Sequence, residues 1–300
     1  MILVTGSEGF IGKRVVRALL EEHHEVIAID RADPQHPRDL CEMPKHLRVD
    51  AVVHLAAHAD VSANWESDAE RAALYRDNIT ATITLMEAVH CTGPIVFAST
   101  ATVYGDSPGR PSMETDVPVA TSPYAASKLA GEALLQAYAH HSGVPLYCLR
   151  LAAAVGHGYS HGHVVDFVRM AKLGVIAART AGNVRRSVVH VADVADLIAQ
   201  LVLGRDPAGI YNVASGQWSW RDTVDVMREV RPRAPLVVHA PDPQVERGWV
   251  GDNLVSISNE KLLSIYHPRR SIRHGVVEAL HDLGWRVGET AAVVPGVIEP

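Results

Sequence analysis

Runs of apolar residues alternate with amphipathic stretches along the first half of the chain. A short apolar segment begins at Ile2, and later ones read EVIAID, DAVVHLAA, GPIVFAST and VPLYCLRL. Segments of this length, rich in Val and Ile, are typical of strands buried on both faces of a parallel sheet. Between them, IGKRVVRALLEE and the stretch from Ala69 to Val89 carry apolar residues at helical spacing. This alternation up to about residue 150 predicts an α/β fold, a doubly wound parallel sheet with helices on both faces.

The first predicted strand leads into a glycine-rich turn, TGSEGFIG, which opens a predicted helix. Gly6, Gly9 and Gly12 allow a tight turn and a close approach of a pyrophosphate, whose charge the helix N-terminus would stabilise. The second strand ends in Asp30, where a carboxylate could accept hydrogen bonds from an adenosine ribose. Asp30 would repel a 2′-phosphate, and the adjacent Arg31 weakens this effect without reversing it. The sequence therefore predicts NAD rather than NADP as the cofactor.

Tyr124 and Lys128 lie four residues apart in SPYAASKLAGE, so both side chains should lie on one face of a helix. A tyrosine hydroxyl, with a pKa of about 10 in water, is a base at neutral pH only if a positive charge stabilises its phenolate. Lys128 can supply that charge. Thr100, at the end of the preceding strand, is expected to meet Tyr124, with Ser99 as the nearby competitor. A cofactor site combined with such a pair predicts an enzyme.

The composition is that of an ordinary soluble enzyme. With 300 residues, 47% of them hydrophobic, the chain can bury a substantial core in one large domain or two closely packed ones. A net charge of −6 argues against a nucleic-acid partner. No apolar run approaches the ~20 residues of a membrane span, and the strand that begins at Ile2 leaves no room for a signal peptide. We therefore expect a cytoplasmic protein with no membrane association.

The chain resembles the extended short-chain dehydrogenase/reductases, and within them the sugar-nucleotide epimerase/dehydratase group. The resemblance runs from Met1 to about Trp285 and rests on the ordered motifs TGSEGFIG, HLAA, FASTATVYGD, SPYAASKLAGE, RRSVVHVADVA, YNVASGQWSW and a late LGW. It implies a Rossmann domain over residues 1–150, to which part of 187–213 returns. A smaller, mixed α/β lobe over 151–300 would bind the substrate.

The resemblance also implies roles for individual residues. Thr100, Tyr124 and Lys128 would be catalytic, and Lys128 would also bind the nicotinamide ribose. The contacts to NAD would come from the residues Gly6, Gly9, Phe10, Ile11, Gly12, Asp30, Arg31, Asp39, Leu40, Leu55, Ala56, Ala57, Tyr124 and Lys128. Arg186 would bind the substrate diphosphate, or Arg185 in its place, because guanidinium geometry suits phosphate oxygens. Arg247, whose spacing departs from the family pattern, is the candidate for a second phosphate contact.

The residues after Thr100 distinguish among the reactions of this group. Sugar 4,6-dehydratases carry an Asp-Glu pair there and related decarboxylases carry a glutamate at the second position, whereas this chain has Ala101 and Thr102. The stretch STATVYG is similar to that of 4-epimerases. The resemblance thus implies an NAD-dependent epimerase of a nucleotide-linked sugar, which acts through a transient ketone. Ala152 and Ala153 replace the Phe-Asn pair of family epimerases, so the pocket should be wider at that wall.

Two alternatives remain open. A dehydrogenase or ketoreductase with an exchangeable cofactor and a non-nucleotide substrate is favoured by Ala152-Ala153 and by the short segment between Asp30 and His54. An NAD-sensing regulator without catalysis is disfavoured, because relatives of that kind would be expected to lose Tyr124 or Lys128.

Two further expectations concern metals and partners. His157, His161 and His163 are closely spaced, but no local carboxylate or cysteine completes a ligand set, so no metal is expected. Family members commonly form homodimers by packing two helices from each subunit, which here would be residues 69–89 and 124–140. We therefore expect a homodimer.

Overall fold

The computed structural model describes residues 1–35, 38–43, 45–61, 63, 65–105, 109–160, 162–172, 185–232 and 255–286. Its centre is a six-stranded sheet in the order β10-β7-β6-β4-β1-β2, and every neighbouring pair of strands in it is parallel. These strands are β1 (Ile2–Thr5), β2 (Val26–Ile29), β4 (Ala51–His54), β6 (Ile95–Thr100), β7 (Leu146–Leu151) and β10 (Gly209–Val213). The predicted doubly wound parallel sheet is confirmed.

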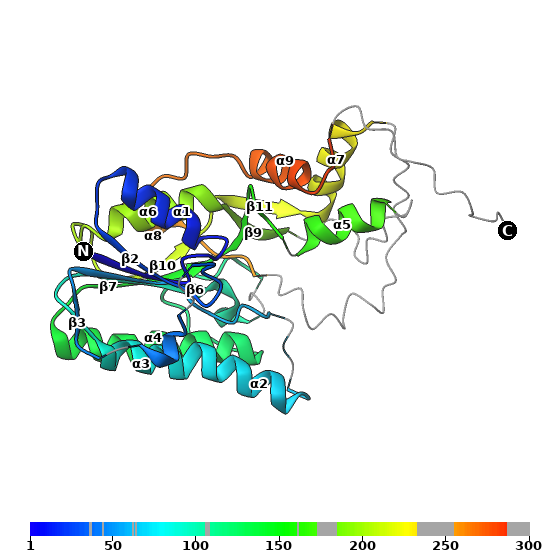
Figure 1. Cartoon of the computed structure of the whole chain (residues 1–300). Coiled ribbons are helices and arrows are strands. Elements are labelled where there is room, and N and C mark those ends of the chain that lie inside the picture. The colour runs from blue at the N-terminus through cyan, green and yellow to red at the C-terminus, as the bar shows by residue number, and fades with distance from the viewer. Residues whose placement is uncertain are drawn as a thin grey trace.

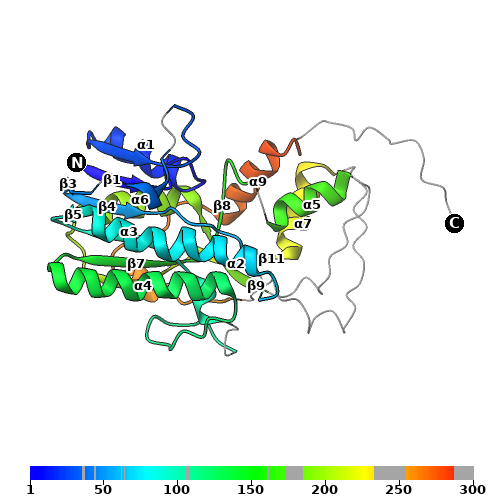
Figure 2. The ribbon, with the colours of Figure 1, turned by 60° about the horizontal axis from the view of Figure 1, so that its bottom comes forward.

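Helices cover both faces of this sheet (Figure 1). One face carries α1 (Gly12–Glu21), α6 (Val191–Leu201) and α8 (Glu260–Leu263). The other carries α2 (Asp68–Tyr75), α3 (Ala81–Ala88) and α4 (Pro123–Ser142). Figure 2 shows α3 and α4 side by side across that second face. Because both faces are covered, every residue of β1, β4 and β6 is buried, which explains their apolar sequences.

The stretch predicted as one amphipathic helix, Ala69 to Val89, is divided in the structure. A π-helical segment, η2 (Arg76–Thr80), separates α2 from α3, and Val89 already begins the short strand β5 (Val89–Cys91). Within η2 the buried Asn78 accepts a hydrogen bond from the backbone N–H of His58 at 2.7 Å and donates one to Ser127 Oγ at 2.9 Å. The π segment therefore fastens the loop after β4 to helix α4, and such segments are frequent at functional sites.

The connection between β2 and β4 is short, as the sequence predicts. Its described residues hold no α-helix, only the 3₁₀ turn η1 (Leu40–Glu42) and the strand β3 (Leu47–Val49), which pairs in parallel with β5. A second 3₁₀ turn, η3 (Ala101–Tyr104), follows β6 directly. Leu40 of the first turn and Ala101 and Thr102 of the second line cavities of the protein.

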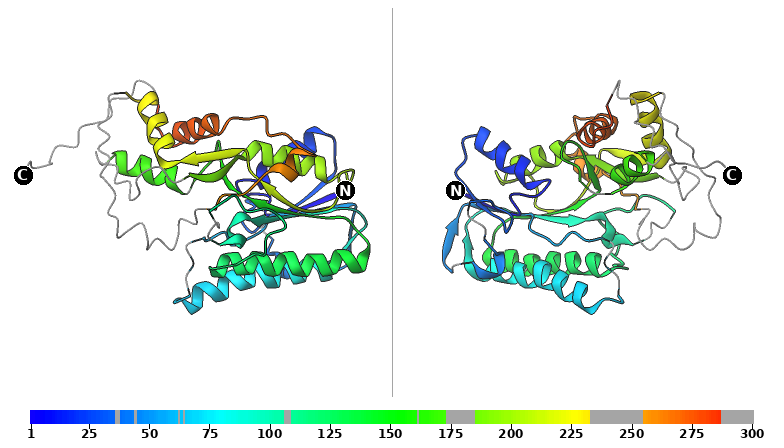
Figure 3. Two further views of the ribbon diagram at one scale, coloured as in Figure 1. Left: turned by 180° about the vertical axis from the view of Figure 1, so that it is seen from behind. Right: turned by 45° about the vertical axis from the view of Figure 1, so that its right-hand side comes forward.

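A smaller lobe begins after β7. Strand β8 (Ala153–Val155) pairs in parallel with β9 (Arg185–His190), which pairs antiparallel with β11 (Gly216–Ser219). The lobe's helices are α5 (His163–Lys172), α7 (Trp220–Val230) and α9 (Ile272–Asp282). Figure 3 shows these helices at one end of the large sheet. Between β9 and β11 the chain returns to that sheet, since α6 packs on α1 and β10 pairs with β7. No helix in the described part of the chain is long and apolar enough to cross a membrane.

A buried ion pair connects α4 to the large sheet. Glu132 and Arg150 are 5% and 2% exposed, and two hydrogen bonds of 2.8 and 3.0 Å join their side chains. Ser99 donates a further hydrogen bond to the Glu132 carboxylate, and Arg150 donates one to the Tyr104 hydroxyl at 2.8 Å. Burying two charges is tolerated when their hydrogen bonds are satisfied in this way, whereas the loss of one partner leaves the other uncompensated.

Glu132→Gln should therefore lower the free energy of unfolding by about 3–5 kcal/mol, because it leaves the Arg150 guanidinium buried without its counter-charge. Urea unfolding at neutral pH measures this. The control is Glu21→Gln, which removes the exposed partner of Arg17 four residues earlier in α1 and should leave the urea midpoint unchanged. Equal effects of the two substitutions would contradict the buried pair's role.

Candidate functional site

Two adjoining cavities open where the strands of the large sheet end. The larger, which we call the tyrosine pocket, holds about 430 Å³ and is lined by Tyr124 and Lys128 among others. The smaller, the aspartate pocket, holds about 280 Å³ and is lined by Asp30, Asp39 and Asp77 among others. The residues that line both are Gly6, Gly9, Leu55 and Ala57. Ligands of doubly wound sheets bind at this carboxyl edge, so the two cavities form one continuous candidate site.

The turn between β1 and α1 leaves no room for a side chain at Gly6 or Gly12. Gly6 has φ +72°, and a Cβ on it would lie 2.6 Å from the backbone nitrogen of Ala56. A Cβ on Gly12 would lie 2.0 Å from the carbonyl oxygen of Gly6. The buried Ser7 hydroxyl has no hydrogen-bond partner among the described residues, and Ile11 gives the start of α1 no side-chain cap. The turn therefore fits an anionic group such as a pyrophosphate, which would lie at the positive end of the α1 dipole.

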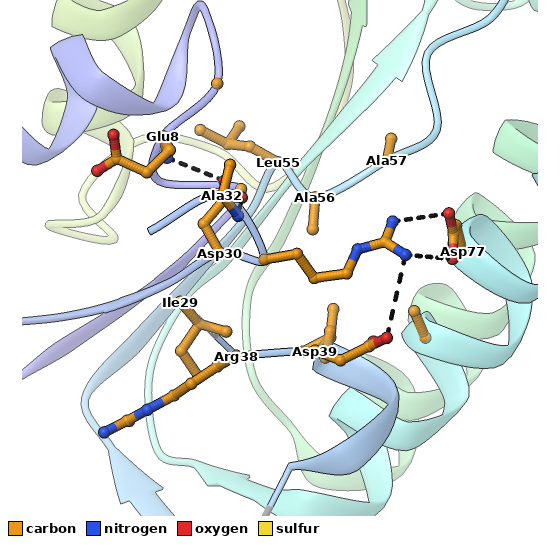
Figure 4. Close-up of a pocket in the computed structure, with 15 residues that line it drawn as sticks. Glu8, Ile29, Asp30, Ala32, Arg38, Asp39, Leu55, Ala56, Ala57 and Asp77 are labelled. Atoms are coloured by element: carbon orange, nitrogen blue, oxygen red, sulfur yellow. Dashed lines mark hydrogen bonds and ion pairs between the residues drawn. The ribbon is translucent and has the colours of Figure 1, made fainter. Parts of the chain in front are cut away.

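Asp30 lines the aspartate pocket, just after β2 (Figure 4). One carboxylate oxygen accepts the backbone N–H of Glu8 at 2.9 Å and the other that of Ala32 at 2.8 Å. These bonds fix the carboxylate beside the glycine turn, where a ribose hydroxyl would be bound. Arg31 is directed instead to Asp77, with hydrogen bonds of 3.1 and 2.7 Å.

All the residues that the sequence analysis assigned to NAD line one or both cavities. Those of the aspartate pocket are Gly6, Gly9, Asp30, Arg31, Asp39, Leu40, Leu55, Ala56 and Ala57. Those found only in the tyrosine pocket are Phe10, Ile11, Gly12, Tyr124 and Lys128. The structure thus brings together residues that are widely separated in the sequence, although their role toward a cofactor stays a prediction.

The three predicted catalytic side chains meet in the tyrosine pocket. Thr100 is the last residue of β6, while Tyr124 and Lys128 belong to the first two turns of α4, whose N-terminus Ser122 caps. The Thr100 side chain is hydrogen-bonded to Tyr124, and its Oγ1 lies 3.0 Å from that of Thr102. The arrangement gives a line of hydroxyl groups along which a proton can pass.

Burial dominates the acid–base properties of this pair. It raises the pKa of Tyr124 to about 12, against the opposing effect of the hydrogen bond with Thr100. Burial also lowers the pKa of Lys128 to about 8, against the opposing effect of the Glu132 charge. The sequence predicted that Lys128 would lower the pKa of Tyr124, but in the structure the tyrosine's desolvation outweighs any such effect. The Lys128 ammonium lies 4.8 Å from the centroid of the Phe97 ring.

The arginines predicted to bind a diphosphate have different surroundings. Arg186 lines the tyrosine pocket, with its guanidinium 5.0 Å from the centroid of the Trp220 ring. Arg185 is exposed, and its guanidinium lies 3.6 Å from the carboxylate of Asp222. Arg186 is therefore the better placed of the two for a ligand in the cavity. Arg247 lies outside the described residues.

The wall of the tyrosine pocket after β7 consists of small side chains. Ala152, Ala153 and Ala154 line it, and the expected greater width at this wall stays a prediction. Tyr159, from the loop after β8, lines the same cavity and packs edge-on against Phe10 with ring centroids 5.8 Å apart. Tyr159 thus brings the second lobe against the glycine turn.

The histidines have structural partners. His54 is buried between the hydroxyls of Thr5 and Thr82, at 2.8 and 2.9 Å, and burial lowers its pKa to about 3, so it is neutral. His157 lies 2.8 Å from a carboxylate oxygen of Asp282. His161 and the side chain of His163 lie outside the described residues. Within the described residues, no group of three or more His, Cys, Asp or Glu side chains could hold a metal.

Several residues that line or support the site carry little signal in the sequence. Asp77 and Asn78 lie in the π segment. The spacing of apolar residues in the sequence does not distinguish a π-helical turn from an α-helical one. Glu132 follows Lys128 by four residues, and this i, i+4 spacing on the face of Tyr124 was the one signal that could have identified it. Tyr159 follows a run of small residues and offers no local pattern.

A parallel sheet with this glycine turn, an acid after the second strand and a Tyr-x-x-x-Lys pair on α4 defines an extended short-chain dehydrogenase/reductase. A model of the NAD dependent epimerase/dehydratase family matches residues 2–214, which is more than half of the chain. The protein belongs to this family. The predicted family is confirmed, and so is NAD as the family's cofactor.

The UDP-glucose 4-epimerase of Halalkalibacterium halodurans is 28% identical in an alignment of 302 positions, which covers 83% of this chain and 90% of the relative. That of Mycolicibacterium smegmatis is 30% identical in an alignment of 287 positions, which covers 83% of this chain and 87% of the relative. The crystal structure of the UDP-glucose 4-epimerase of Thermus thermophilus in complex with NAD superposes with a TM-score of 0.74 at 27% identity, and covers 94% of this chain and 98% of its own.

The pH dependence of stability should reveal the lowered pKa of Lys128. Between about pH 8 and its usual 10.5, Lys128 is neutral in the folded protein and charged in the unfolded chain. The unfolded state then binds more protons, so this residue makes stability rise with pH over that interval. From pH 8 to 10.5, the unfolding free energy of wild type should therefore rise relative to that of Lys128→Met. Urea unfolding of both proteins across this range measures the change.

The control for this experiment is Lys45→Met, which replaces an exposed lysine outside both cavities. Its difference from wild type should stay constant over the same pH range. A Lys128→Met difference that also stays constant would contradict the lowered pKa of Lys128.

Proposed function

We propose that this protein is an NAD-dependent epimerase of a nucleotide-linked sugar. The observation that carries the proposal is the meeting of Thr100, Tyr124 and Lys128 in the cavity that the glycine turn also lines. Ala101 and Thr102, which line the same cavity, offer no carboxylate for the removal of water. The likeness to UDP-glucose 4-epimerases over most of their length supports the same reaction.

The chain's own residues would move the proton. NAD, when bound, would supply the acceptor and later the donor of the hydride, together with an added positive charge. Tyr124, as phenolate, takes the proton of the sugar hydroxyl, directly or through the Thr100 hydroxyl. Lys128, in its charged form, stabilises that phenolate, and Glu132 favours the charged form of Lys128. The pKa of about 12 for Tyr124 means that added positive charge is needed before it acts as a base.

Arg186 would bind the diphosphate of the substrate. Its guanidinium lines the tyrosine pocket and stacks on Trp220, which restricts its orientation. A planar cation held in this way suits two phosphate oxygens at once. The nucleotide end of the substrate would then lie toward the second lobe, with the sugar beside Tyr124.

A second candidate is a dehydrogenase or ketoreductase that releases its cofactor and acts on a non-nucleotide substrate. Ala152 and Ala153 favour it, because they provide no side chain that could hold a phosphate at the wall they line. The two candidates share the proton chemistry of Tyr124 and differ in the retention of NAD and in the response to nucleotides.

The deciding experiment is to denature the purified protein, assay the released NAD, and measure thermal protection of the native protein by UDP- and dTDP-sugars. We expect stoichiometric NAD and protection by a nucleotide sugar, followed by detection of the epimerised product. Absence of bound NAD together with no response to any nucleotide would reject the epimerase in favour of the second candidate.

Tyr124→Phe should lower kcat/KM by at least about 10²-fold, because it removes the group that takes the substrate proton. The NAD content of the variant should stay that of wild type. The matched control is Tyr138→Phe, which removes a hydroxyl from the same helix that donates to the Val89 carbonyl at 3.0 Å and lines neither cavity. Retention of full activity by Tyr124→Phe would rule out the proposed mechanism.

A further inference from the structure

The aspartate pocket contains two residues with opposite preferences for the cofactor. Asp30 suits the free 2′-hydroxyl of NAD, whereas an arginine close to the same ribose accommodates the 2′-phosphate of NADP. Arg31 follows Asp30 directly, and both line the pocket. The position of the Arg31 guanidinium therefore bears on which dinucleotide the protein accepts.

The structure holds that guanidinium mainly on Asp77, while Oδ2 of Asp39 lies farther away, 4.0 Å from Nη1 of Arg31. Nη1 and Nη2 of Arg31 donate to Oδ1 and Oδ2 of Asp77 at 3.1 and 2.7 Å, a two-pronged pairing that fixes the direction of the side chain. In Figure 4, Asp30 and Asp77 lie on different elements that flank the pocket. The Asp77 side chain is only 9% exposed, against 52% for Arg31, so the aspartate is the fixed partner and the arginine the one that is held.

Asp77 cannot readily follow Arg31 out of this position. It lies in the π segment η2, which the adjacent Asn78 fastens to the backbone of His58 and to Ser127. Arg76 also donates to Asp77 Oδ1, at 2.9 Å. Movement of Asp77 toward the ribose would break these contacts, whereas Arg31 could swing away from Asp77 if the carboxylate lost its charge.

We infer that Asp77 is a specificity-determining residue for the cofactor: it holds Arg31 away from the ribose 2′ position, so that Asp30 alone meets that position and NADP is excluded. This inference rests on the proposed binding of the adenosine half of NAD in the aspartate pocket. It requires no contact between Asp77 and the cofactor. Arg38, which lines the same pocket, points away from Asp39 and Asp77 in Figure 4 and is not held by this pairing.

The experiment compares NAD and NADP binding to wild type and Asp77→Asn. NADP is added to protein loaded with NAD, and the NAD displaced is quantified after filtration. In Asp77→Asn the preference for NAD over NADP should fall by about tenfold, the worth of one charge-assisted hydrogen bond to phosphate. The preference should stay in favour of NAD because Asp30 is unchanged. Asp77→Ala, which also removes the remaining acceptor oxygen, should show at least the same fall.

A double variant separates the release of Arg31 from the mere loss of a negative charge. Arg31→Gln alone should change NADP binding little. Added to Asp77→Asn, it should abolish the gain in NADP binding that Asp77→Asn produces. A gain that persists in the double variant would show a general electrostatic effect and overturn the role of Arg31. Unchanged discrimination in both Asp77 variants would also overturn the inference.

The matched control is Asp116→Asn. Asp116 accepts two hydrogen bonds of 2.8 Å from Arg110 in the same two-pronged manner but lines neither cavity. The preference of Asp116→Asn for NAD over NADP should equal that of wild type, and a tenfold change in that preference would overturn the inference. If wild type binds neither dinucleotide, the proposed function itself is rejected. If wild type binds NAD but the Asp77 variants keep its preference for NAD over NADP, only the inference is rejected.

Discussion

The close approach of two backbone segments at the end of β1 is the constraint on which the site depends. At Gly6 the chain turns with a positive φ so near to the loop after β4 that even a methyl group would meet Ala56. This contact positions both cavities, because the residues that line both of them come from the turn and from the segment around Ala56. A side chain at Gly6 would push the turn away from the loop after β4, and one at Gly12 would push the start of α1 away from Gly6.

Buried charge is the second organising element, and it lies under the tyrosine pocket. Lys128 and Glu132 follow Tyr124 at successive turns of α4, and Glu132 in turn is bound to Arg150 of β7 and to Ser99 of β6. The Glu132 carboxylate thus stabilises the contact between α4 and the sheet and also favours the charged form of Lys128. Ser99 is held by this network, which leaves Thr100, the next residue of the strand, to face Tyr124. The alternation of side chains along a strand explains why one hydroxyl is structural and its neighbour belongs to the cavity.

The features that could be predicted from the sequence are those that backbone geometry ties to a fixed spacing. The glycine turn, the acid after β2 and the Tyr124–Lys128 pair each follow from local structure. The pairing of Arg31 with Asp77 and that of Ser99 with Glu132 could not be predicted, because they join residues 46 and 33 positions apart through the tertiary fold. The division of the helix at Arg76 could not be predicted either, because helical spacing continues through the π segment. The raised pKa of Tyr124 could not be predicted from the sequence either, because desolvation depends on all the residues packed around the ring.

Two parts of the lining of the tyrosine pocket differ in a way that suits the proposed reaction. Arg186 is stacked on Trp220 and offers a charged group. Ala152, Ala153 and Ala154 offer only small apolar side chains, which cannot hydrogen-bond a sugar. An epimerase must hold its substrate while the ketone turns to present its other face, and both requirements are met when binding energy is concentrated at the diphosphate and the sugar is left loosely held. A dehydrogenase gains nothing from such freedom, because it needs only one orientation of the carbon that reacts. The bare alanine wall, which alone could be taken to argue against a nucleotide sugar, is thus compatible with one that is held by its other end.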